Sequence, residues 1–201
     1  MIVQNKNIGL FFGSFNPIHV GHVMIANYMV EFEGVDEVWF VVSPQNPFKQ
    51  KSQLISEEAR FEMVNIAVSN LKRIIASDVE FDMPQPSYTI NTLNLLSTKY
   101  PNTNFHLLMG SDNIINISRW KDAGTIINRY PILVYPRNGY PIKQDDLTEK
   151  TKITKAPVVD ISSTMIREWI AAGHEVNAFV PEGVFKYIKN KRLYQVYDSE
   201  Q

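Results

Sequence analysis

The sequence of 201 residues contains no cysteine, which excludes both a disulfide framework and a thiolate metal site. It has no apolar run near the roughly 20 residues that a membrane-spanning helix needs, and the run before Gly13 is too short for a signal peptide. It also lacks an excess of charge of either sign, with a formal net charge of -1. The chain therefore has no general electrostatic attraction to nucleic acid. We therefore expect a cytoplasmic protein that binds neither membranes nor nucleic acids.

The composition is ordinary for a globular protein, with 44% hydrophobic and 20% charged residues. The length suits one domain, or one domain with a small addition. The sequence shows neither an internal repeat nor a low-complexity linker. We predict a single domain over residues 1–201, in which residues 178–201 form a C-terminal helical extension.

Apolar runs alternate with helical patterns along most of the chain. Short runs predict strands at residues 8–12, 35–43, 73–76, 105–109, 131–135 and 157–161. Apolar residues at helical spacing predict helices at residues 20–32, from an N-cap at Ser56 to about 71, at 89–99, 163–172 and 181–194. Residues 138–155 are expected to form a long surface loop. This alternation predicts parallel βαβ units, and hence an α/β fold with a Rossmann-like, doubly wound sheet.

The first predicted strand runs directly into a glycine turn, GSFNPIHVGH, from Gly13 to His22. Ligands of such sheets bind at the carboxyl ends of the strands, so this turn marks a binding site. The free amides at the following helix start attract an anion, and Gly21 leaves room where a side chain would obstruct. His19 and His22 lie three residues apart and project toward the same region. The pattern indicates a site for a polyphosphate.

Other interpretations of this turn are weaker. A histidine pair can bind zinc, but neither cysteine nor a nearby carboxylate at ligand spacing completes such a site, and we predict no protein metal site. A Walker loop is absent because no Gly-Lys-Ser/Thr follows, and the G-x-G-x-x-G fingerprint of a dehydrogenase is absent as well. A capping or packing role remains the alternative for either histidine alone.

A second anion site is predicted near the other end of the chain, in ISSTMIR, from Ile161 to Arg167. Hydroxyls and free amides gather at the start of a helix there, and Arg167 follows one turn later with a guanidinium that matches phosphate geometry. An ordinary serine N-cap with a solvated arginine is the alternative. Lys49, in the loop after the second strand, is a further candidate for a phosphate contact, with a solvated lysine as its alternative.

These segments resemble the HxGH nucleotidylyltransferase superfamily and, within it, the bacterial nicotinate mononucleotide adenylyltransferases. The first motif of that family usually reads Gly-Gly-Thr-Phe-Asp-Pro-x-His-x-Gly-His, and this chain has Phe12, Ser14 and Asn16 at three of its positions. ISSTMIR matches the second motif of the superfamily. SYTINTL, from Ser87 to Leu93, resembles the family's Ser-Tyr-Thr-x-Asp-Thr-Leu, with Asn91 in place of the aspartate.

The resemblance implies a set of roles. His19, His22 and Arg167 would be catalytic. The residues that would bind ATP are Gly13, Ser14, Phe15, His19, Gly21, His22, Gly110, Asp112, Ile161, Ser162, Ser163, Thr164 and Arg167. The residues that would bind the pyridine nucleotide are Ser14, Phe15, Lys49, Tyr88, Thr89, Trp120, Lys121 and Arg137. An indole face suits the cationic pyridinium, although a partly buried core residue is the more common fate of a tryptophan.

The resemblance therefore implies an adenylyltransferase of nucleotidylyltransferase fold type that joins nicotinate mononucleotide to the AMP part of ATP, with release of pyrophosphate, in NAD biosynthesis. Mg²⁺ would accompany ATP, held mainly by phosphate and water. Nicotinamide mononucleotide and phosphopantetheine are the alternative acceptors, and SYTINTL with Trp120 argues against the second. A non-catalytic nucleotide-binding module is the alternative from another class, and a homo-oligomer is one possible assembly.

Overall fold

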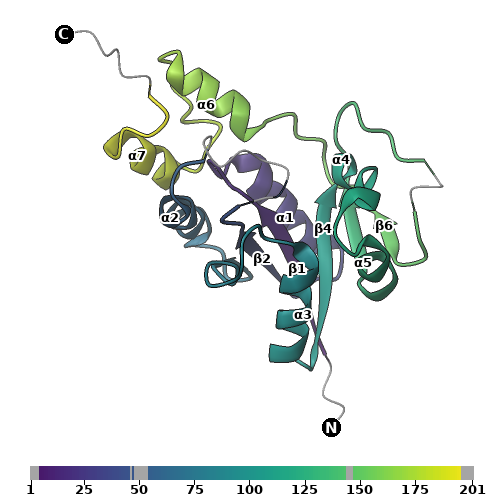
Figure 1. Cartoon of the computed structure of the whole chain (residues 1–201). Coiled ribbons are helices and arrows are strands. Elements are labelled where there is room, and N and C mark those ends of the chain that lie inside the picture. Colours follow the sequence, from purple (N-terminus) through teal and green to yellow (C-terminus); the bar gives the residue numbers. More distant parts are fainter. Residues whose placement is uncertain (1–4, 46, 48–53, 144–146, 196–201) are drawn as a thin grey trace.

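The computed structural model describes residues 5–45, 47, 54–143 and 147–195. Among these residues, six strands form one sheet in which all neighbouring strands are parallel. In spatial order the strands are β3 (Ile74–Ser77), β2 (Glu37–Val42), β1 (Lys6–Gly13), β4 (Thr103–Gly110), β5 (Ile132–Tyr135) and β6 (Thr151–Ile153). The predicted α/β, Rossmann-like sheet is thereby confirmed (Figure 1).

Helices cover both faces of this sheet. One face carries α1 (Val20–Phe32) and α2 (Glu57–Val68), and the core on this side also includes side chains of α6 (Ser163–Ala171) and α7 (Glu182–Asn190). The other face carries α3 (Thr89–Lys99), α4 (Ser111–Ile114) and α5 (Ala123–Arg129), and a short 3-10 helix, η2 (Ile117–Arg119), lies between the last two. Figure 1 shows α6 and α7 beyond one end of the strands, near the C-terminus of the chain.

The strands divide their side chains between two apolar cores, because successive residues of a strand point to opposite faces. In β1, Leu10 belongs to the core on the α3 face and Phe11 to the core on the α1 face. In β2, Phe40 and Val41 divide in the same way. Strands buried on both faces read as continuous apolar runs, which is why these two were predictable from the sequence.

The predicted helix boundaries agree closely with the structure. Ser56 caps α2, because its hydroxyl accepts a hydrogen bond from the backbone N–H of Ala59 at 3.3 Å. Gly34, which follows the end of α1, adopts a positive φ of 73°, a conformation that glycine tolerates better than other residues. Residues 111–129, for which the sequence predicted no element, contain α4, η2 and α5.

The predicted strand at residues 157–161 is wrong. Those residues form no strand, and the edge strand β6 instead lies at Thr151–Ile153, within the predicted surface loop, where it pairs with β5. Pro157 has no backbone N–H for a ladder bond, and Val158 is 55% exposed, so the apolar run does not mark a buried strand. The edge position of β6 needs little apolar burial, so its sequence carries only a weak strand signal.

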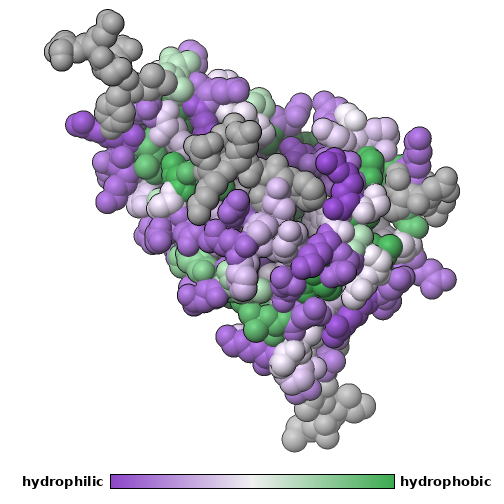
Figure 2. Space-filling model, in the orientation of Figure 1, coloured by the Kyte–Doolittle hydropathy of each residue, from purple (hydrophilic) through white to green (hydrophobic). Residues whose placement is uncertain are grey.

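The last helix belongs to the same apolar core as the sheet. Val184 and Ile188 of α7 are buried, and the helix packs against α2. The assignment of residues 178–201 as an extension of a single domain stays a prediction. None of the described helices is long and apolar enough to cross a membrane. Hydrophilic residues cover most of the face in Figure 2, and the hydrophobic ones form small separate groups.

Candidate active site

The switch point of the sheet lies between β1 and β4, whose chain connections run to opposite sides, and this is where ligands of such sheets bind. At the end of β1, a β-carbon on Gly13 would lie 2.7 Å from the ring of Phe15, so only glycine fits without a shift. Phe15 itself has a positive φ of 46° and is buried under the turn. The chain then passes Asn16 and Pro17 and enters α1, with His19 at the N-cap.

The two histidines of this turn form a stacked pair. Their ring centroids are 3.7 Å apart, and the ring planes differ by 26°. The backbone N–H of His19 donates to Nδ1 of His22 at 3.2 Å, so a neutral His22 carries its proton on Nε2. A β-carbon on Gly21 would lie 3.0 Å from Nδ1 of His19 and 2.9 Å from the side chain of Val159. Gly21 therefore lets the helix start pack close to the pair.

Burial and, to a smaller extent, the charge of Arg137 lower the pKa of His19 to about 4. His19 is therefore neutral at pH 7, and its buried Nδ1 atom has no hydrogen-bond partner in the described part of the chain. A neutral imidazole provides one N–H donor and one acceptor. Binding of a polyanion next to this ring would favour its charged form and raise its pKa.

The start of α6 meets the histidine turn, as the two motifs predict. Ser162 caps the helix by accepting from the backbone N–H of Met165 at 3.2 Å. The hydroxyl of Ser163 donates to the main-chain oxygen of Pro17 at 2.8 Å. One N–H of Arg167 donates to the main-chain oxygen of Asn16 at 2.8 Å. The two anion-binding segments are thus joined directly.

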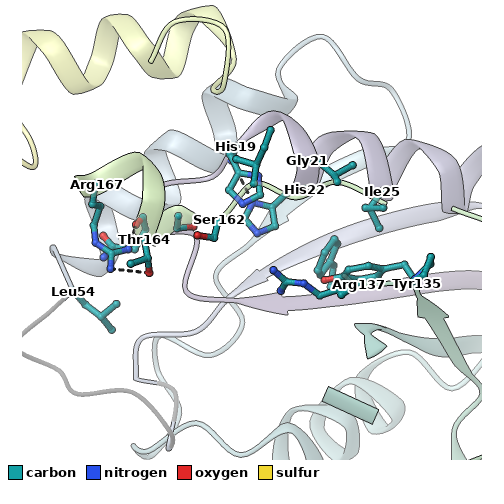
Figure 3. Close-up of a pocket in the computed structure, with 16 residues that line it drawn as sticks. His19, Gly21, His22, Ile25, Leu54, Tyr135, Arg137, Ser162, Thr164 and Arg167 are labelled. Carbon is teal, nitrogen blue, oxygen red and sulfur yellow. Dashed lines mark hydrogen bonds between the residues drawn. The ribbon is translucent and has the colours of Figure 1, made fainter. Parts of the chain in front are cut away.

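A cavity of about 270 Å³ lies between these two segments (Figure 3). Its lining includes predicted site residues from both motifs and one from the end of β5, namely His19, Gly21, His22, Arg137, Ile161, Ser162, Ser163, Thr164 and Arg167. Figure 3 shows the stacked histidines between two pairs of side chains: Arg167 and Thr164 on one side, and Arg137 and Tyr135 on the other. We call this space the histidine pocket. Its basic side chains and helix N-termini suit a polyphosphate.

A second cavity of about 430 Å³ adjoins the first. It contains four of the residues predicted to bind the pyridine nucleotide, namely Tyr88, Thr89, Trp120 and Lys121. Phe11 and Tyr135 line both cavities, with ring centroids 5.7 Å apart, so one aromatic pair separates them. We call this space the tryptophan pocket.

The described lining of the tryptophan pocket carries two cations, Arg119 and Lys121, and no carboxylate. The ammonium of Lys121 lies 4.6 Å from the centroid of the Tyr88 ring, which also lines the pocket. This cation–π contact holds the charge at the pocket wall. The pocket therefore combines aromatic faces with a field that favours anions.

The remaining predicted residues take other places. Arg137, predicted on the pyridine side, lines the histidine pocket and lies 3.5 Å from a carboxylate oxygen of Asp112. Gly110 is the N-cap of α4, and Ser14 and Phe15 are buried residues of the histidine turn. The described lining of the two pockets includes none of Asp112, Gly110, Ser14 and Phe15. Lys49 lies outside the described residues.

The sequence did not reveal the role of Arg60, which is 1% exposed. Its guanidinium donates to the main-chain oxygens of Ser14 at 2.7 Å, Ser43 at 2.8 Å and Pro44 at 3.0 Å. It thus joins the loops after β1 and β2 to α2. The available signal was its position, because Arg60, Val64 and Val68 lie at the i, i+4 and i+8 positions of one buried stripe. Tyr194, which hydrogen-bonds Asn16, was missed as well.

The described part of the chain contains no cluster of three or more histidine and carboxylate side chains that would hold a metal ion. Basic and hydroxyl side chains dominate the histidine pocket. The donor set of this pocket is suited to phosphate oxygens rather than to a metal.

Comparison with known proteins gives the family. A family model described as cytidylyltransferase-like matches residues 10–169. A protein of Bacteroides fragilis named probable nicotinate-nucleotide adenylyltransferase is 46% identical over 180 residues, which cover 90% of each chain. A protein of Christiangramia forsetii with the same name is 42% identical and covers 96% of this chain and 100% of its own. The chain belongs to the nicotinate-nucleotide adenylyltransferase family.

A solved structure agrees with the fold. The nicotinic acid mononucleotide adenylyltransferase of Plasmodium falciparum, complexed with NaAD, superposes with a TM-score of 0.81 and covers 94% of this chain and 97% of its own. At 22% identity the likeness supports the fold alone. The resemblance of the sequence motifs to the nicotinate-nucleotide adenylyltransferase family is confirmed, and so is the predicted fold type.

Proposed function

We propose that the protein transfers AMP from ATP to nicotinate mononucleotide, forming nicotinate adenine dinucleotide and pyrophosphate in NAD biosynthesis. The observation that carries the proposal is the meeting of the histidine turn and the start of α6 in one basic pocket that adjoins an aromatic pocket. The names of the relatives, which match nearly the whole chain, support the same activity. We propose that it acts in the cytoplasm.

In this proposal ATP binds in the histidine pocket. Backbone amides at the start of α6 would face its phosphates, and Arg167 adds a forked donor. Asp112 and Arg137, which pair at 3.5 Å, are proposed to meet the adenosine half. The buried Oδ1 atom of Asp112 has no hydrogen-bond partner among the described residues, which leaves it as an acceptor for a ribose hydroxyl.

Nicotinate mononucleotide would occupy the tryptophan pocket. The pyridinium ring would stack against Trp120, and the segment around Tyr88 and Thr89 would hold the nucleotide. Arg119 and Lys121 favour the acid over the amide, because nicotinate carries a carboxylate that nicotinamide lacks. This charge difference supports nicotinate mononucleotide over nicotinamide mononucleotide as the acceptor.

The chemical step is an in-line displacement at the α-phosphorus of ATP. A phosphate oxygen of nicotinate mononucleotide forms the new P–O bond, and the bond between the α-phosphorus and its bridging oxygen to the β-phosphate breaks. Pyrophosphate leaves with the electron pair. The attacking phosphate is already an anion at neutral pH, so the step needs no general base.

The protein contributes positioning and charge stabilisation. His19 and His22 would donate hydrogen bonds to the phosphoryl oxygens, and Nε2–H of a neutral His22 is such a donor. Arg167 and the amides at Ser162 to Thr164 would stabilise the charge that moves toward pyrophosphate. Mg²⁺ is proposed to enter with ATP and to neutralise part of its phosphate charge.

The experiment is a comparison of acceptors. Pyrophosphate release from ATP is measured with nicotinate mononucleotide, nicotinamide mononucleotide and phosphopantetheine in parallel. We expect the highest kcat/KM for nicotinate mononucleotide. Pyrophosphate release with none of the three would mean that the protein is a nucleotide-binding module without turnover. A higher kcat/KM for nicotinamide mononucleotide or phosphopantetheine would make that compound the acceptor in place of nicotinate mononucleotide.

A further inference from the structure

The end of the described chain returns to the histidine turn. The hydroxyl of Tyr194 donates to Oδ1 of Asn16 at 2.9 Å, across 178 positions of sequence. Residues 191–195, which we call the C-terminal strap, are tied to α7 by three backbone bonds, from the N–H of Lys191 to Tyr187 at 3.0 Å, of Arg192 to Lys189 at 3.1 Å and of Leu193 to Ile188 at 3.0 Å. The strap therefore joins the last helix to the first turn.

The conformation of the strap is an unusual one. Arg192 has a φ of 49° and Tyr194 a φ of 63°, both in the left-handed region that residues with a β-carbon seldom adopt. Leu193 and Tyr194 pack against the core that contains α1, α2 and α7. Such backbone conformations persist where the surrounding contacts determine them, and they occur often at functional sites.

The hydroxyl of Tyr194 acts as the donor of this contact. The amide oxygen of Asn16 can only accept a hydrogen bond, so the hydroxyl donates, and burial raises the pKa of Tyr194 well above its ordinary value. Asn16 is buried. Tyr194 is partly buried, and the amide oxygen of Asn16 provides a protein partner for its hydroxyl.

Asn16 is held from two directions. Tyr194 binds its side-chain oxygen at 2.9 Å, and Arg167 binds its main-chain oxygen at 2.8 Å. A second N–H of Arg167 donates to Oγ1 of Thr164 at 3.2 Å. A shift of Asn16 would therefore move one of the anchors that set the direction of the Arg167 guanidinium in the histidine pocket.

We propose that Tyr194 is a positioning residue for nucleotidyl transfer: its hydroxyl fixes Asn16, and Asn16 in turn fixes Arg167 beside the phosphates. The inference rests on the proposed function, because its effect appears in the rate of AMP transfer. The strap does not touch the substrates in this scheme. It sets the geometry of a residue that does.

The test compares Tyr194→Phe with Tyr187→Phe. Both remove one hydroxyl from tyrosines that pack on the same core, and Tyr187 belongs to α7 rather than to the strap. We expect kcat of Tyr194→Phe to fall roughly tenfold, the effect of one positioning hydrogen bond. KM for ATP should change less than about threefold, and the melting temperature should match that of Tyr187→Phe. Equal kcat values in the two variants would overturn the inference.

A mutant cycle tests whether the hydroxyl acts through Asn16. Asn16→Asp keeps an oxygen acceptor, so adding Tyr194→Phe should again lower kcat roughly tenfold. Asn16→Ala removes the acceptor, so adding Tyr194→Phe should leave kcat unchanged. The same tenfold loss in the Asn16→Ala background would contradict the inference. Absence of turnover in the wild-type protein would instead refute the proposed function.

Discussion

Arg167 donates a hydrogen bond to the main-chain oxygen of Asn16 at 2.8 Å, although 151 positions of sequence separate the two residues. Asn16 lies in the turn after the first strand, and Arg167 lies in the helix that begins at Ser163. The contact closes the histidine pocket on one side and directs a permanent positive charge toward it.

Replacement of Arg167 by lysine keeps the charge and removes the fork. We expect kcat of Arg167→Lys to fall about tenfold. The planar guanidinium can bind the main-chain oxygen of Asn16 and a phosphate at the same time, and an ammonium on a flexible stem does this less well. Arg167→Ala should lose about a hundredfold or more. Steady-state kinetics of pyrophosphate release measure both, with Arg129→Lys on the exposed face of α5 as the control. Equal rates for Arg167→Lys and the wild type would show that the fork is not needed.

The stability of the protein should depend on the protonation of His19. Its pKa is about 4 in the folded protein and 6.5 in the reference state. Between these two pKa values the unfolded chain binds more protons than the folded protein, so the free energy of unfolding rises with pH. The stability that comes from neutral His19 is therefore lost as the pH falls. At pH 5 the loss relative to neutral pH is on the order of 2 kcal/mol.

Urea unfolding of His19→Gln at pH 5 and pH 7 measures this contribution. The free energy of unfolding should differ less between pH 5 and pH 7 in His19→Gln than in the wild type, by roughly that amount. The exposed His174 provides the matched control, His174→Gln, which should behave like the wild type. A His19→Gln variant with the wild-type pH dependence would show that His19 is not buried in its neutral form.

Removal of positive charge from the tryptophan pocket should weaken the preference for the acid. In Lys121→Gln we expect the ratio of kcat/KM for nicotinate mononucleotide to that for nicotinamide mononucleotide to fall about threefold to fivefold, the effect of one exposed charge. Arg119→Gln should act in the same direction. Lys99→Gln is the control, since Lys99 makes a similar contact with Tyr100 away from the pocket.

The ratio separates two effects of the same charge. Both substrates carry the phosphate, so a contact between Lys121 and the phosphate would lower both kcat/KM values equally. An unchanged ratio together with two lower values would assign Lys121 to the phosphate. It would also leave the acid preference to other groups of the pocket.

Arg60 should be required for the folded state. Arg60→Ala leaves the main-chain oxygens of Ser14, Ser43 and Pro44 without the donor that the structure provides. Each buried acceptor left unsatisfied in this way costs about 1–3 kcal/mol. Denaturant unfolding measures it, with Arg73→Ala at an exposed site as the control. A loss no larger than that of the control would mean that these loops hold their conformation without Arg60.

Most of the fold was predictable from the sequence, for physical reasons. Strands such as β1 and β2 are buried on both faces and give continuous apolar runs. β6 escaped prediction because an edge strand is specified by pairing with its neighbour rather than by burial. The run at residues 157–161 resembled a strand by composition only. Local patterns therefore predicted the interior of the sheet and failed at its edge.

The site residues, too, were predictable only in part from local sequence patterns. The histidine turn and the start of α6 were predictable because each is a continuous motif whose chemistry is local. Arg137, predicted to bind the pyridine nucleotide, lines the histidine pocket, and its ligand stays a prediction because the sequence does not say which way a side chain points from the end of β5. Arg60 and Tyr194 act through contacts with distant backbone and side-chain oxygens. Such contacts leave little trace in sequence patterns.

The central claim is that the histidine pocket carries out the transfer of AMP. The most direct test is the single-turnover rate of nicotinate adenine dinucleotide formation by the wild type and His22→Ala, at saturating ATP and nicotinate mononucleotide. We predict that the wild type forms the dinucleotide and that His22→Ala, with an unchanged fold, is slower by about a hundredfold or more. A His22→Ala rate within a few-fold of the wild type would contradict the assignment of this pocket as the active site.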